Sequence, residues 1–175
     1  MLAASVCVAV PIGVAQQESP AAAAVAQPGI LRAADLASLF PQQVFFRGQS
    51  ATVQMRNSGG IRYRDGMLTM AALVDTSGYS SGIQQRYQAY LITEVPLRIG
   101  GASGRKLPPG AYGVGFIQDN RFVIMDLGAH ELMNLASERD AELHRAMPLQ
   151  VLDAPQHGSY RLYVGRAFVA LQRVE

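Results

Sequence analysis

The sequence predicts an all-β protein, an antiparallel β-sandwich with one or two short peripheral helices. Short runs in which bulky and small or polar side chains alternate are typical of β-strands. Residue pairs that favour tight turns separate many of these runs, namely Asp65-Gly66, Pro109-Gly110, Asp119-Asn120 and Gly165-Arg166. Sequential antiparallel pairing of this kind builds a sandwich or an up-and-down β-barrel, and the barrel is the alternative because strand order cannot be read from the sequence.

The composition fits one β-rich domain with a short extension. A chain of 175 residues can bury a substantial core, and 49% of its residues are hydrophobic while 16% are charged. The formal net charge of +2 is small and the basic residues are scattered, which argues against nucleic acid as a partner. Lys106 is the only lysine, so we expect arginines in forked ion pairs with carboxylates.

The N-terminus has the pattern of a signal peptide. An apolar run from Leu2 to Ala15 is too short to span a bilayer as a helix, and Gly13-Val14-Ala15 has the small-x-small pattern of a cleavage site. Ala24-Val25-Ala26 offers a later site. We therefore expect a signal peptide over 1–15, with cleavage as late as 26, and a secreted or periplasmic protein. The alternative is a buried N-terminal strand.

The mature chain is expected to begin with a flexible tether over 16–29, which is rich in alanine, proline and glutamine. The β-rich domain then covers 30–175. Cys7 is the only cysteine and lies in the signal peptide, so the mature protein is expected to be disulfide-free. No membrane span is expected after the signal peptide is removed.

The first third of the domain is expected to contain one helix followed by strands. The apolar positions of Ile30–Phe40 suit a short helix that Pro41 ends. Asn57–Gly60 is predicted to be a loop. Around it we expect the strands Val44–Phe46, Ala51–Asn57, Ile61–Arg64 and Met67–Val74, the last of them apolar enough to be buried on both faces.

The stretch Ile99–Ile117 contains a turn that runs into an unusual strand. Pro109-Gly110 suits the centre of a type II turn. After it, Tyr112, Val114 and Phe116 form a bulky face, while Ala111, Gly113 and Gly115 leave the other face nearly bare. A bare face lets another backbone or a flat ligand approach closely. Packing of a second layer is the simpler interpretation, and ligand binding by Tyr112, Gly113 and Gly115 is the alternative.

The run GRKLPPGAYGVGF, Gly104–Phe116, resembles the G-x-x-L-P-x-G-x-Y hairpin of several secreted bacterial β-sandwich families, many of unknown function. The resemblance covers a small part of the chain. It implies an extracytoplasmic β-sandwich and does not imply any activity.

The last third is expected to contain further strands and a helix. Phe122–Met125 is a strand, and Ala129–Leu135 fits a strand or a helix. Ser137–Arg145 fits a helix capped by the Ser137 hydroxyl. The remaining strands are Leu149–Leu152, Tyr160–Val164 and Ala167–Leu171.

Asp75 lies in the one segment that resembles an enzyme motif. Leu73-Val74-Asp75-Thr76 looks like the start of the retroviral-type aspartic protease loop, in which two carboxylates share a proton. Ser77 stands where that family has glycine, and one such aspartate would require a dimer. The simpler interpretation is a turn in which Asp75 binds its own backbone.

Metal binding is not expected, because His130-Glu131 lacks the second histidine of a zinc-protease helix: Asn134 stands in its place. No cofactor is expected. The segment Tyr79–Tyr90 is the other candidate surface. It combines aromatic, amide and guanidinium groups that suit sugar or peptide recognition, with Tyr79, Arg86, Tyr87 and Tyr90 as binding residues. The alternative is an ordinary loop that enters a strand.

These features favour a secreted or periplasmic non-catalytic binding or structural domain. Its partner would be an unknown protein, a cell-envelope component or a small ligand. The first alternative is a dimeric hydrolase that uses Asp75. The second is a lipocalin-like carrier whose apolar interior would be lined by Phe116, Phe122, Leu162 and Phe168.

Overall fold

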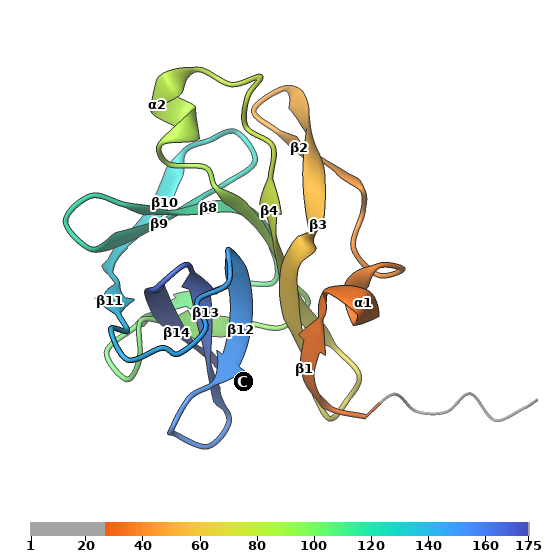
Figure 1. The fold of residues 1–175 in the computed structure, drawn as a ribbon, viewed down its shortest axis with the longest axis vertical. Coiled ribbons are helices and arrows are strands. Elements are labelled where there is room, and N and C mark those ends of the chain that lie inside the picture. Colours follow the sequence, from red (N-terminus) through yellow and green to blue (C-terminus); the bar gives the residue numbers. More distant parts are fainter. Residues whose placement is uncertain (1–26, 175) are drawn as a thin grey trace, which may run out of the picture.

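The structure is a computed structural model that describes residues 27–174, and in it two antiparallel sheets pack face to face (Figure 1). The predicted signal peptide over 1–15, the first part of the predicted tether and Cys7 lie outside the described residues.

The larger sheet has eight strands in the order β1-β3-β4-β5-β8-β9-β10, and β2 pairs with the first half of β3. Its strands are β1 (Gly29–Arg32), β2 (Gln43–Phe46), β3 (Gln49–Arg62), β4 (Leu68–Val74), β5 (Ala89–Thr93), β8 (Gly110–Ile117), β9 (Arg121–Met125) and β10 (Glu131–Ala136).

The smaller sheet has six strands in the order β12-β13-β14-β6-β7, and β11 pairs with the start of β14. Its strands are β6 (Leu97–Ile99), β7 (Arg105–Leu107), β11 (Glu138–Arg139), β12 (Leu149–Asp153), β13 (Ser159–Val164) and β14 (Ala167–Arg173). Neither sheet closes on itself, so the predicted β-sandwich is confirmed and the barrel alternative is wrong.

Both faces of the larger sheet are covered. Its inner face packs on the smaller sheet through residues such as Ile61, Leu91 and Val114. A second apolar cluster on its outer face is covered by β2, by α1 (Ala33–Leu36) and by the segment around α2 (Ser81–Gln84). This double burial explains why β4 is apolar along almost its whole length, as the sequence predicts.

Three of the four predicted turns join neighbouring strands. Asp119 and Asn120 both have positive φ, 58° and 52°, and connect β8 to β9 in the geometry of a two-residue hairpin. Gly165, with φ of 60°, connects β13 to β14. Asp65-Gly66 lies in the connection from β3 to β4. A type I′ turn needs positive φ at both central residues, and here only Gly66 has it. The turn is therefore not of type I′, and the connection is longer than two residues.

The predicted hairpin at Pro109-Gly110 is wrong. The chain there leaves β7 in the smaller sheet and enters β8 in the larger one, so these strands are not paired with each other. Pro108 and Pro109 have no N–H to donate, which suits a segment that crosses between sheets. The hairpin in this stretch is instead the β6–β7 pair, which turns at Gly100 and Gly101 with φ of 96° and 76°.

The predicted loop at Asn57–Gly60 is also wrong, because these residues lie within β3. The glycines serve close packing there rather than a turn. A Cβ on Gly59 would lie 3.1 Å from the backbone nitrogen of Val151 in β12, and one on Gly60 would lie 2.8 Å from the carbonyl oxygen of Thr69 in β4.

Two short helices lie at the periphery. The predicted helix over Ile30–Phe40 is wrong in its first part, since Gly29–Arg32 pairs with β3, but α1 lies within the predicted range. The second helix is α2, within Tyr79–Tyr90, the candidate binding surface for which an ordinary loop is the alternative. Where Ala129–Leu135 is predicted to be a strand or a helix, Glu131–Ala136 forms a strand, β10.

The predicted capped helix over Ser137–Arg145 is wrong. The chain there forms β11 and then an irregular segment. The Arg166 guanidinium holds this segment by donating to the carbonyl oxygens of Asp140, at 3.1 Å, and Ala141, at 2.8 Å. These tertiary bonds replace the internal bonds that a helix would have made.

The bare face of β8 is covered by the outer layer. A Cβ on Gly113 would clash with the ring of Phe46 in β2, and one on Gly115 would clash with the backbone carbonyl of Arg86. The Gln88 side chain completes this contact, since its amide nitrogen donates to the Phe116 carbonyl oxygen at 2.9 Å and its amide oxygen accepts from the Phe116 N–H at 3.0 Å. The packing interpretation of this face therefore agrees with the structure.

Gly115→Ala should lower the free energy of unfolding by more than about 2 kcal/mol, because the new methyl group meets backbone that cannot rotate away. The matched control is Gly82→Ala in α2, where no atom of the described residues lies within 4 Å of the added Cβ. There the free energy should rise by up to about 1 kcal/mol. Urea denaturation of both variants measures the difference, and equal stabilities would contradict the close contact at Gly115.

Candidate functional site

The aromatic residues of the segment Tyr79–Tyr90 are buried in the outer core. Tyr87 has 0% exposure and stacks on Phe46 with ring centroids 3.9 Å apart. Tyr79 packs edge-on against Tyr87, and its hydroxyl oxygen lies 3.1 Å from the carbonyl oxygens of both Phe46 and Gln49. Tyr90 is 6% exposed and belongs to the same cluster. These rings hold the outer layer on the sheet.

The other predicted binding residues are engaged in the same packing. Arg86 forms an ion pair with Glu131, and its carbonyl rests against Gly115. Tyr112 lies in the inner core and donates to the carbonyl oxygen of Pro108 at 2.9 Å. The structure thus brings the two predicted segments together, but through Phe46 and buried contacts. Ligand binding by these seven residues stays a prediction, and of their side chains only that of Arg86 is substantially exposed.

Asp75 is solvated and bonded to its own loop. Its Oδ1 accepts the N–H of Ser77 at 2.9 Å, and this bond holds the pKa of the Asp75 carboxyl below its ordinary value. A proton-sharing pair would require a second carboxylate beside Asp75, and the bond that the structure gives Asp75 comes from the N–H of its own loop. Within residues 27–174, no group of three or more His, Cys, Asp or Glu residues could hold a metal ion.

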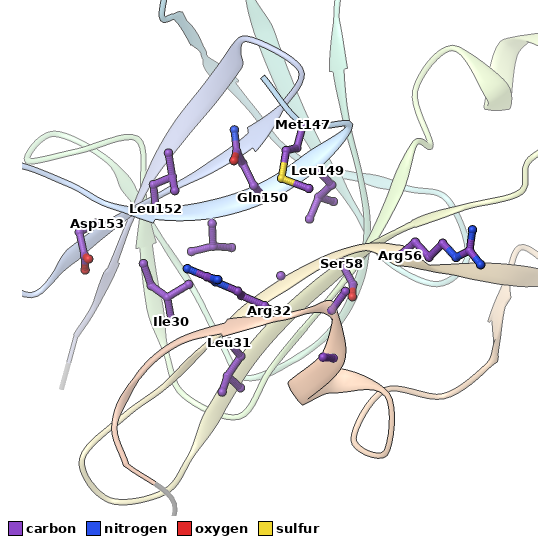
Figure 2. A pocket seen from close by; sticks show the side chains of 14 residues that line it. Ile30, Leu31, Arg32, Arg56, Ser58, Met147, Leu149, Gln150, Leu152 and Asp153 are labelled. Carbon is purple, nitrogen blue, oxygen red and sulfur yellow. The ribbon is translucent and has the colours of Figure 1, made fainter. Parts of the chain in front are cut away.

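A groove of about 630 Å³ lies between the two sheets, bounded by β1 and β3 on one side and β12 on the other (Figure 2). Each of β1 and β12 ends its sheet in the described part of the chain, since β1 pairs only with β3 and β12 only with β13. The two sheets come close where Gly59 of β3 meets Val151 of β12, and both residues line the groove. The groove therefore lies along the edges of the two sheets.

The walls of the groove are mainly apolar, with cationic groups among them. Leu149, Leu152 and Met147 line the β12 side, and Met147 keeps 43% of its surface exposed. On the opposite side, Arg32 extends into the space between β1 and β12, and Arg56 stands at one end (Figure 2). Apolar walls with a few polar groups are typical of binding clefts.

A second hollow of about 530 Å³ continues the groove beyond Asp153, which lines both. Arg62, Arg64, His157 and Tyr160 line this second hollow. Arg173 also lies there; its guanidinium donates to Asp65 at 2.7 Å and lies over the ring of Tyr63. We call the two hollows together the trough.

The trough is not evident in the sequence. Its arginines stand at positions 32, 56, 62, 64 and 173, and the strand pattern marks Arg62 and Arg64 only as solvent-facing. The one usable signal is the Gly59-Gly60 pair, since a glycine pair inside a strand indicates that another backbone comes close. Recognising β12 as that backbone requires the three-dimensional structure.

Comparisons with protein-family models, with curated proteins and with solved structures find no match to the chain. Among the described residues, no helix has the length and apolar character needed to cross a membrane.

Tyr87→Phe should leave the free energy of unfolding unchanged or raise it by about 1 kcal/mol, because the buried Tyr87 hydroxyl has no hydrogen-bond partner among residues 27–174. Tyr79→Phe is the control, and it should lower that free energy by about 1 kcal/mol since the Tyr79 hydroxyl has carbonyl acceptors. Chemical denaturation of the two variants measures both changes in the free energy of unfolding. A large loss in Tyr87→Phe would show that its hydroxyl is bonded.

Alkaline pH should unfold the protein. Burial raises the pKa of all seven tyrosines, to about 12 for Tyr63. A tyrosine that stays neutral in the folded protein adds stability that is complete below pH 10 and is lost as the pH rises towards 12, because only the unfolded chain releases its proton. Tyrosinate absorbance should therefore appear together with loss of circular dichroism. Ionisation near pH 10 in a folded protein would contradict this prediction.

Proposed function

We propose that the chain is a non-catalytic binding domain that acts outside the cytoplasm and takes an extended segment of a partner protein into the groove between β1 and β12. The observation that carries this proposal is the groove itself. It combines apolar walls, cationic side chains and two strands that each end a sheet.

The shape of the site supports a linear partner rather than a compact one. At about 3.3 Å per residue, the five residues of β12 span roughly 17 Å, and the second hollow extends the trough further. An extended peptide of about five to seven residues fits this length. The outer edge of a strand also carries backbone N–H and C=O groups with which a peptide can pair.

Two features of the sequence support an extracytoplasmic location. The apolar run before Ala15 ends in a cleavage-site pattern, and Gly104–Phe116 resembles the hairpin of secreted β-sandwich families. The described residues contain no cysteine, so the sandwich is held together without thiol chemistry.

Neither alternative function has an observation in its favour. Asp75 is solvated, and its carboxylate accepts the N–H of Ser77 in its own loop. Of the residues predicted to line a carrier cavity, Phe122, Leu162 and Phe168 are buried, and Phe116 packs on Phe122 with ring centroids 4.7 Å apart.

A bulky side chain placed in the groove should weaken peptide binding. Ala34 lines the groove and is exposed, so Ala34→Tyr should fill part of it and lower the affinity for selected peptides at least about tenfold. The probe is a library of random peptides of about 12 residues displayed on phage, selected on the full chain and then measured individually by biolayer interferometry.

The matched control is Ala37→Tyr, which adds the same side chain at an exposed position that does not line the groove. This variant should bind the selected peptides as the parent does. The proposal fails if the library yields no binder, or if both variants bind equally well.

A further inference from the structure

We infer that the segment bound in the trough is acidic, with acidic and apolar side chains in alternation. This inference rests on the proposed function, because it specifies the chemistry of the partner that the trough accepts. It follows from the charges and from the unequal walls of the trough.

The charge of the trough is strongly one-sided. Arg32, Arg56, Arg62 and Arg64 line it, together with the ion-paired Arg173, whereas Asp153 is the single carboxylate among the described residues that line it. Among residues 27–174, no carboxylate oxygen lies within 4.0 Å of a guanidinium nitrogen of the first four arginines.

Arginines elsewhere in the sandwich show what such side chains do when a partner is supplied. Arg86 pairs with Glu131, Arg161 lies near Asp140, and Arg121 donates to the side-chain and backbone oxygens of Asn134. A carboxylate on a bound segment would accept hydrogen bonds from the guanidiniums of the trough in the same way. The charge of the trough thus complements an anionic chain.

The two walls differ, and this difference specifies a pattern. Both walls carry apolar side chains, such as Met147 and Leu152 on the β12 side and Ile30 on the β1 side, but the guanidiniums of Arg32 and Arg56 belong only to the wall formed by β1 and β3. Successive side chains of an extended strand point in opposite directions. A strand lying along the trough would therefore place acidic side chains toward the arginines and apolar side chains toward β12.

A peptide is favoured over other polyanions for the same reason. Nucleic acids and anionic polysaccharides carry charge along their whole length and offer few apolar side groups to the β12 wall. They also lack the amide N–H and C=O groups that pair with a strand edge.

The test compares two peptides of about 12 residues, each fused to a soluble fluorescent protein. In one, glutamate alternates with valine; in the other, glutamine replaces glutamate. Fluorescence anisotropy with the full chain measures the affinity at about 50 mM and about 300 mM NaCl. The glutamate peptide should bind at least about tenfold more tightly at low salt and lose most of that advantage at high salt.

Charge variants locate the effect. Arg32→Gln combined with Arg56→Gln should weaken binding of the glutamate peptide at least about fivefold and leave the glutamine peptide nearly unaffected. The matched control combines Arg105→Gln with Arg139→Gln, which removes two exposed arginines outside the trough and should have little effect.

The outcomes separate this inference from the proposed function. If both peptides bind equally and Ala34→Tyr blocks both, the acidic preference is overturned while the groove remains a binding site. If neither peptide binds and the random library also yields no binder, the proposed function fails as well. Two further results overturn the inference: an equal loss in both charge variants, or equally tight binding of a 12-nucleotide single-stranded DNA at the same site.

Discussion

The outer layer of this sandwich can lie flat on the larger sheet because Gly113 and Gly115 leave no side chain in its way. The Phe46 ring and the Arg86 carbonyl occupy the space where two Cβ atoms would otherwise stand. With that contact made, β2 and α2 close over the outer face, and the tyrosine cluster becomes part of a core. The larger sheet is therefore buried on both sides, and what it leaves accessible is concentrated at its edges.

Local features of the sequence were sufficient for the fold class and for most turns. Asp119-Asn120 and Gly165-Arg166 form turns as predicted because their conformational preferences are local. The hairpin predicted at Pro109-Gly110 is wrong for a different reason. These residues favour a turn, but they cannot specify whether the next strand stays in the same sheet. The Ser137–Arg145 segment failed for a related reason, since bonds from the distant Arg166 outweigh its helix propensity.

The candidate site was far less accessible to sequence reasoning. Tyrosine and glutamine side chains suit both a recognition surface and a hydrogen-bonded core, and the hydroxyl contacts of Tyr79 show that the second role prevails here. The trough depends on how two sheet edges meet. Arg32 lies opposite Gly59 only because β1 and β3 pair, and β12 comes close there only because Gly59 admits its backbone.

The near absence of lysine has a practical consequence for handling this molecule. Lys106, the one lysine in the sequence, lies exposed on β7, at the edge of the smaller sheet opposite to β12. Apart from the amino terminus, an amine-reactive dye or sensor surface would find one attachment point. A molecule coupled through Lys106 would be held in a single orientation with its trough turned toward the solution.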